Sequence, residues 1–286
     1  MQRKTILGVV AAASVLALAG CGRASLTTTH ETYHQDGMVA AVKGHTNASK
    51  VTYQVDGHTK ESLAVHNGTF VIQVPTTTKR QSVKLAANGS RKTIHVSAAK
   101  SLTDYQSLQK SFNQALTGSK LSKADQGKAM ALQKAAASLK KQPTPEAAAQ
   151  VGALQRDVQA AMTTAKQQAK GQLLPVKTPA NGVSDVVSTK DYRIRMNVQN
   201  GQVLGATMIV PTKSFKQKAT QKQFGTSFAL LTNGVGADSK SVMKQFGKET
   251  KSVKSGSSSI DPIYSKGVKF TIGLSPADIY IFVVKQ

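Results

Sequence analysis

The sequence predicts a multidomain α+β protein: a small β-sandwich, then a helical segment rich in Ala, Gln and Lys, then an α+β domain with an antiparallel sheet. Three observations support this fold class. Residues 38–99 contain short alternating apolar runs separated by turn signals. Residues 100–172 repeat apolar side chains at helical spacing, and residues 184–286 combine both patterns. A chain of 286 residues is long enough for two or three such domains.

Six short runs between residues 38 and 99 alternate apolar and polar side chains. Asp56-Gly57, Asn67-Gly68 and Asn88-Gly89 separate several of them, and such pairs favour tight hairpin turns. Alternation buries one face of a strand, so we expect two packed sheets. The predicted strands are Met38–Val42, Val51–Val55, Ser62–His66, Thr69–Val74, Ser82–Ala87 and Lys92–Ser97.

The order of these runs resembles that in the immunoglobulin-like domains of bacterial surface proteins. Such domains usually act as spacers or binding modules, so the resemblance implies no catalytic chemistry. The residues that carry it are Val42-Lys43-Gly44, Val51-Thr52-Tyr53-Gln54-Val55, Gly68-Thr69-Phe70 leading into Val74-Pro75, Val83-Lys84-Leu85-Ala86-Ala87 and Thr93-Ile94-His95-Val96.

Helical periodicity dominates residues 100–172. Three helices are expected: one after a Thr103 cap, one over Ser122–Lys141, and one that starts at Thr144-Pro145 and ends at Gly171. We expect a helical hairpin or a three-helix unit with a thin, Ala-rich seam. The apolar residues on the helix faces are Tyr105, Leu108, Phe112 and Leu116; Ala124, Ala131, Leu132, Ala135 and Leu139; and Val151, Leu154, Val158, Ala161 and Ala165.

The C-terminal part begins with a predicted linker, Leu173–Val183, which contains two prolines. From residue 184 the order ββααβββ is expected, with both helices on one face of the sheet. The first two strands form a hairpin across Asn200-Gly201. The elements are Tyr192–Val198, Val203–Val210, helices near Thr220–Leu231 and Ser239–Thr250 with Asp238 as the cap, and strands Ile260–Tyr264, Val268–Leu274 and Ile279–Val284.

The N-terminus has the layout of a secretory signal. Arg3 and Lys4 precede an uncharged apolar stretch, Ile6–Ala19, which is too short to span a bilayer as a helix. Leu18-Ala19-Gly20 before Cys21 resembles the lipobox of bacterial lipoproteins. The resemblance implies that residues 1–20 are removed, that Cys21 takes acyl chains such as palmitate, and that the protein is lipid-anchored on the extracytoplasmic face of the cell membrane.

Cys21 is the single cysteine of the chain, which excludes a disulfide framework and a cysteine-based zinc site. Residues 21–37 are rich in Thr and poor in apolar residues, and we expect them to form a flexible lipidated tether. This stretch contains His30-Glu31-Thr32-Tyr33-His34, which matches the H-E-x-x-H signature of zinc proteases. That chemistry needs a buried helix and a third ligand, so we expect neither a metal nor catalysis here.

No other catalytic constellation is evident. All six histidines lie between positions 30 and 95, and the carboxylates of the C-terminal segment are widely spaced. Ser-x-x-Lys recurs, as at Ser97, Ser107 and Ser241, without the companion motifs of penicillin-binding proteins, as chance predicts in a chain rich in Ser and Lys. We therefore expect no enzyme activity and no cofactor.

The chain is strongly basic, with 38 Lys and Arg against 14 Asp and Glu. This balance predicts attraction to anionic lipid or a wall polymer, although solvated lysines can also simply maintain solubility. Nucleic acid is not expected, because export removes the usual target and no aromatic stacking platform is evident among the basic residues. The densest clusters are Lys213, Lys216, Lys218 and Lys222, then Lys240, Lys244, Lys248, Lys251 and Lys254, which recur at helical spacing.

The leading hypothesis is a membrane-anchored lipoprotein with a non-enzymatic binding or scaffolding role at the cell envelope. One alternative is an accessory subunit that docks onto a membrane complex through the helical segment. It requires that the Ala and Leu seams be exposed instead of consumed internally. The other alternative is an enzyme with an unrecognised pocket in the C-terminal domain. The sequence does not identify the protein partner.

Overall fold

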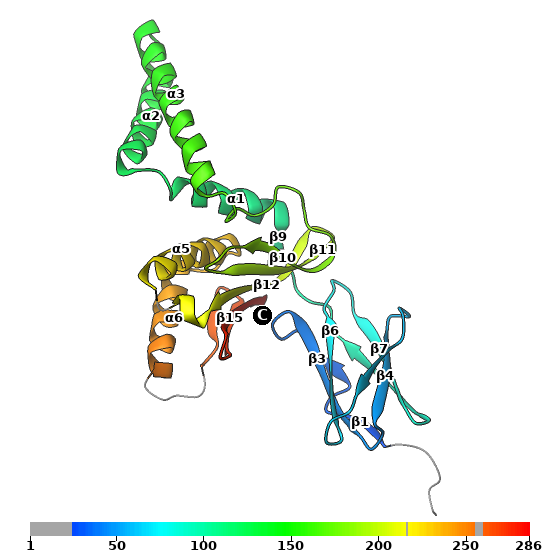
Figure 1. Ribbon diagram of the computed structural model, residues 1–286. Coiled ribbons are helices and arrows are strands. Elements are labelled where there is room, and N and C mark those ends of the chain that lie inside the picture. Colours follow the sequence, from blue (N-terminus) through cyan, green and yellow to red (C-terminus); the bar gives the residue numbers. More distant parts are fainter. Residues whose placement is uncertain (1–24, 216, 255–259) are drawn as a thin grey trace, which may run out of the picture.

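The computed structural model describes residues 25–215, 217–254 and 260–286, with the backbone alone for residues 250–254. Within these residues the chain forms antiparallel sheets and six helices, so the predicted mixed α+β class is confirmed. Figure 1 shows three parts in succession: an N-terminal β-sandwich, a central sheet covered by helices, and a helical hairpin that projects from the centre.

Two sheets with one shared apolar core form the sandwich. One sheet has the order β1-β3-β6 and the other β2-β8-β7-β4-β5. All pairs are antiparallel except β2 with β8. The strands are β1 (Leu26–Thr28), β2 (Thr32–Tyr33), β3 (Val39–Thr46), β4 (Lys50–Val55), β5 (Glu61–Ala64), β6 (Thr69–Pro75), β7 (Gln81–Ala87) and β8 (Ser90–Val96).

The predicted flexible tether over residues 21–37 is wrong for the part that the structure describes. β1 pairs with the end of β3, β2 pairs with β8, and Tyr33 is 6% exposed within the sandwich core. Thr has a high β propensity although it is polar, so a Thr-rich segment can join a sheet when partner strands are present. The first described strand therefore begins five residues after Cys21.

A seven-stranded sheet with the order β10-β11-β12-β15-β14-β13, and with β9 also paired to β12, forms the centre of the molecule. β10 begins at the end of the predicted linker, precedes the first predicted strand, and was missed because it is an edge strand with a bulge between Asp185 and Val187. The strands are β9 (Thr103–Asp104), β10 (Gly182–Ser188), β11 (Arg193–Gln199), β12 (Gln202–Pro211), β13 (Ile263–Ser265), β14 (Val268–Leu274) and β15 (Asp278–Lys285).

The helices α1 (Tyr105–Gly118), α5 (Lys218–Gly234) and α6 (Ser239–Lys254) share one core with the sheet, and the short α4 (Thr212–Phe215) adjoins them. The assignment of α1 to a separate helical unit is therefore wrong. Leu108 and Phe112 are at most 1% exposed, and a Cβ at Gly234 of α5 would collide with Leu108. The large side chains of α1 fill the central core, which explains its position.

The helices α2 (Lys123–Lys141) and α3 (Pro145–Gln168) form a hairpin that leaves the central domain (Figure 1). Their caps follow the sequence. Ser122 accepts from the N–H of Asp125, and Thr144 accepts from the N–H of Ala147, with Pro145 in the first turn. The helices α2 and α3 pack against each other, whereas α1 packs in the central core.

Polar contacts hold the sandwich against the central sheet. Asn197, which is fully buried, donates through Nδ2 to the carbonyl oxygen of Thr76 at 2.9 Å. Gln35 donates through Nε2 to the carbonyl oxygen of Leu204 at 3.1 Å. A Cβ at Gly37 would come within 2.9 Å of the ring of Phe282, so this glycine permits close contact between the two parts.

Candidate functional site

The α2–α3 hairpin has almost no core of its own. No residue of α2 is buried, and Ala165 is the only buried residue of α3. The seam residues Leu132 and Leu154 are half-buried, and Met130 is 61% exposed. Because helices in proteins owe most of their stability to a buried face, a hairpin with so little burial would gain stability if a partner covered it.

A groove of about 970 Å³ lies at the base of the hairpin, between α1, α3 and residues 171–176. Asn113 of α1 holds its outer wall, since its side chain accepts from the N–H of Leu174 and donates to the carbonyl oxygen of the same residue, both at 2.8 Å. Val176 on that wall is 77% exposed. Two lysines and no carboxylate line the groove. Its apolar lining consists of Met162, Leu173, Leu174, Pro175 and Val176.

Sequence reasoning missed this groove because the prolines at 175 and 179 marked the segment as a linker. The apolar run Leu173-Leu174-Pro175-Val176 was the available signal. Leu174 is 1% exposed and belongs to the central core, whereas Val176 points to solvent. The groove therefore lies where the hairpin joins the central domain.

A second cavity, of about 460 Å³, lies between α2 and α3 and has a polar lining. Lys128 and Asp157 bridge the two helices through an ion pair of 2.9 Å. The hydrogen bond to Asp157 raises the pKa of Lys128. The pair therefore links α2 to α3, and this link accounts for the raised pKa of Lys128.

The lysines predicted as anionic contacts lie on α4, α5 and α6. Opposite the lysines of α6, Val242 and Phe246 are buried. Lys216 lies outside the described residues, as do the side chains of Lys251 and Lys254. The remaining six are all exposed and make no ion pair within the described part of the chain; we call them the lysine face: Lys213, Lys218, Lys222, Lys240, Lys244 and Lys248.

An aromatic cluster brings these three helices together. The rings of Phe215 on α4 and Phe224 on α5 lie 5.7 Å apart between centroids. Phe246 on α6 lies 6.4 Å from Phe215 and 5.8 Å from Phe224. Two lysine clusters that are separate in the sequence therefore lie on neighbouring helices.

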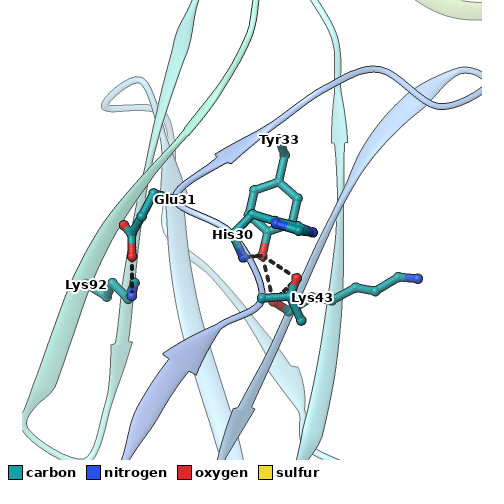
Figure 2. Close-up of polar contacts among 6 residues, drawn as sticks. His30, Glu31, Tyr33, Lys43 and Lys92 are labelled. Carbon is teal, nitrogen blue, oxygen red and sulfur yellow. Dashed lines mark hydrogen bonds and ion pairs between the residues drawn. The ribbon is translucent and has the colours of Figure 1, made fainter.

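The H-E-x-x-H residues are not in a helix (Figure 2). Glu31 forms an ion pair of 2.7 Å with Lys92, and the ring of His30 contacts that of Tyr33 edge-on. The hydroxyl of Tyr33 donates to the carbonyl oxygen of Lys43 at 2.7 Å. Among the described residues, no group of three His, Cys, Asp or Glu could hold a metal. The segment thus has a structural role in the sandwich.

Cys21 lies outside the described residues, which start at Ser25. The N–H of Ser25 donates to the side chain of Asn47 at 2.9 Å, and β1 follows at once. Across the described ranges, no helix is long and apolar enough to cross a membrane.

No family model matches the chain, and no curated protein matches it. Among solved structures, an FMN-binding beta-glucuronidase from Facaelibacterium prausnitzii L2-6 matches at 17% sequence identity with a TM-score of 0.23. The match covers 28% of this chain and 12% of that enzyme's length. A similarity of this size supports no conclusion about fold or activity.

Proposed function

We propose that this protein is a lipoprotein anchored through Cys21 to the extracytoplasmic face of the cell membrane, with a non-enzymatic docking or scaffolding role. The observation that carries the docking role is the α2–α3 hairpin, in which Ala165 alone is buried and Met130 is 61% exposed. The anchor follows from the signal layout of residues 1–20 and the lipobox-like residues before Cys21.

The position of the first described strand is compatible with the anchor. β1 begins at Leu26, so cleavage before Cys21 leaves the described sandwich intact. In this proposal the N-terminal sandwich, whose sequence resembles immunoglobulin-like domains, acts as a spacer between the lipid and the central domain. Two acyl chains give stable attachment where one is marginal.

The burial of the hairpin distinguishes a general scaffolding role from docking as an accessory subunit of a membrane complex. The apolar face of α1 is buried in the central core, whereas the apolar residues of the hairpin seam are only partly buried: Leu132, Leu139, Leu154 and Val158. This observation favours docking onto a partner in a membrane-associated complex. Residues 123–168 contain seven Lys or Arg and three Asp or Glu. The complementary partner is therefore an acidic amphipathic helix of an envelope protein, laid along the seam and the groove at its base.

Site-specific photocrosslinking in intact cells tests this role. A crosslinking residue replaces Met130 on the hairpin or, as a matched control, Val71 on the sandwich, which is 45% exposed. We expect one discrete adduct from position 130 and none from position 71. The adduct should disappear when Cys21→Ser releases the protein, and its partner peptide should be acidic and helical. Equal adducts from both positions would rule out the hairpin as the docking surface.

A further inference from the structure

We propose that the lysine face binds the anionic headgroups of the bilayer that holds the anchor, as a second membrane contact. This inference rests on the proposed anchoring at Cys21. It assigns a separate surface, on α4, α5 and α6, to the membrane and leaves the hairpin to the protein partner.

The charge of this region is unbalanced. Residues 212–254 contain nine lysines and two carboxylates, Asp238 and Glu249. Asp238 accepts from the N–H of Ser241 at 3.1 Å, as an N-cap of α6 does. The six lysines of the face have no carboxylate partner in the described residues. Their charges are thus available to an external polyanion.

The geometry favours a flat surface over a thread-like polymer. Lys240, Lys244 and Lys248 follow one another at intervals of four residues, so they form a row of roughly 12 Å along the exposed side of α6. Lys218 and Lys222 form a similar pair on α5. The grooves and cavities described above lie at the hairpin, away from these lysines. A row of lysines on an exposed helix, with no groove beside it, can contact a flat layer of lipid headgroups.

The short connection to the lipid keeps the folded part near the bilayer. Four residues, Gly22 to Ser25, separate Cys21 from β1 and can span at most about 14 Å. In the view of Figure 1 the sandwich and α6 both extend downwards from the central sheet and the hairpin extends upwards, with the sandwich and α6 on opposite faces of the sheet. Contact through α6 would therefore turn the hairpin away from the membrane and towards its partner.

Vesicle binding of the full mature chain without lipid, carrying Cys21→Ser, tests the proposal. The vesicles are phosphatidylcholine, alone or with about a quarter phosphatidylglycerol. The triple variant Lys240→Gln, Lys244→Gln, Lys248→Gln is compared with a matched triple on the exposed side of α2: Lys134→Gln, Lys140→Gln, Lys141→Gln. Both remove the same charge, and circular dichroism verifies that both fold.

We expect binding to the anionic vesicles alone. The α6 triple should lower the partition coefficient about five-fold per lysine, or roughly 100-fold, and the α2 triple should leave it near the wild-type value. Binding should vanish at about 1 M salt, where the Debye length is about 3 Å.

Three results would overturn the proposal: equal binding to neutral vesicles, equal losses in both triples, or tighter binding to soluble poly(glycerol phosphate) than to vesicles at equal phosphate concentration. The last would assign the face to a wall polymer. Because the assay uses protein without lipid, its failure is separate from a failure of the anchor at Cys21.

Discussion

Replacing Phe112 with Ala tests whether α1 belongs to the central domain. Phe112 is 1% exposed and packs in the core that the helices share with the seven-stranded sheet. Removing a buried phenylalanine ring costs about 3–5 kcal/mol, because transfer energy is lost and a cavity remains. For a domain of this size, each kcal/mol lowers the melting temperature by roughly 2–4 °C, so we expect a fall of about 10 °C.

Leu132→Ala on α2 is the matched control. Its side chain is half-buried on the hairpin, and Ala has the higher helix propensity, so the expected loss is below about 1 kcal/mol. Urea unfolding followed by far-ultraviolet circular dichroism measures both variants, and an unchanged slope confirms that stability alone has changed. If Leu132→Ala lowers the free energy of unfolding as much as Phe112→Ala does, then the hairpin belongs to the same cooperative core as α1.

Three further variants test other contacts. Gly44→Ala should displace β1, since a Cβ there would collide with the carbonyl oxygen of Thr27; hydrogen exchange should show faster exchange at Thr27, and unchanged protection would contradict the strand assignment. Asn197→Ala should destabilise the protein by about 1–3 kcal/mol, because a buried carbonyl loses its donor; a change within about 0.5 kcal/mol would mean that the bond contributes little. For Asp185, hydrogen bonding to Arg195 holds the pKa of the carboxyl below its usual range. The pair therefore stabilises the fold above about pH 4, and this contribution is lost as pH falls through the lowered pKa. Asp185→Asn should lower the melting temperature at neutral pH and flatten its decline in acid, whereas a wild-type acid profile would exclude a role for the pair.

Local patterns predicted the hairpins well. Asn200 and Gly201 have φ angles of 51° and 77°, which is the left-handed backbone expected of this turn. The strand Val268–Leu274 was predicted with its observed bounds. Alternation and turn residues specify such elements within a short stretch of chain, so no distant partner is needed to recognise them.

Elements that form by pairing with distant segments could not be predicted from local sequence patterns. β2 exists because it pairs with β8, more than 60 residues further along the chain. The helical period identified α1 but not what it packs against. Its large side chains, Tyr105 and Phe112, distinguished it from the Ala-rich α2 and were the available signal for a core helix. The spacing of Lys240, Lys244 and Lys248 did predict their shared exposed side, because one helix alone determines it.

The intact mass of the protein purified from membranes tests the anchor most directly. We expect a mature chain that begins at Cys21 and carries the added mass of its acyl chains, and we expect Cys21→Ser to leave the membrane fraction. A chain that retains Met1, or that begins at Cys21 without added lipid mass, would contradict the account.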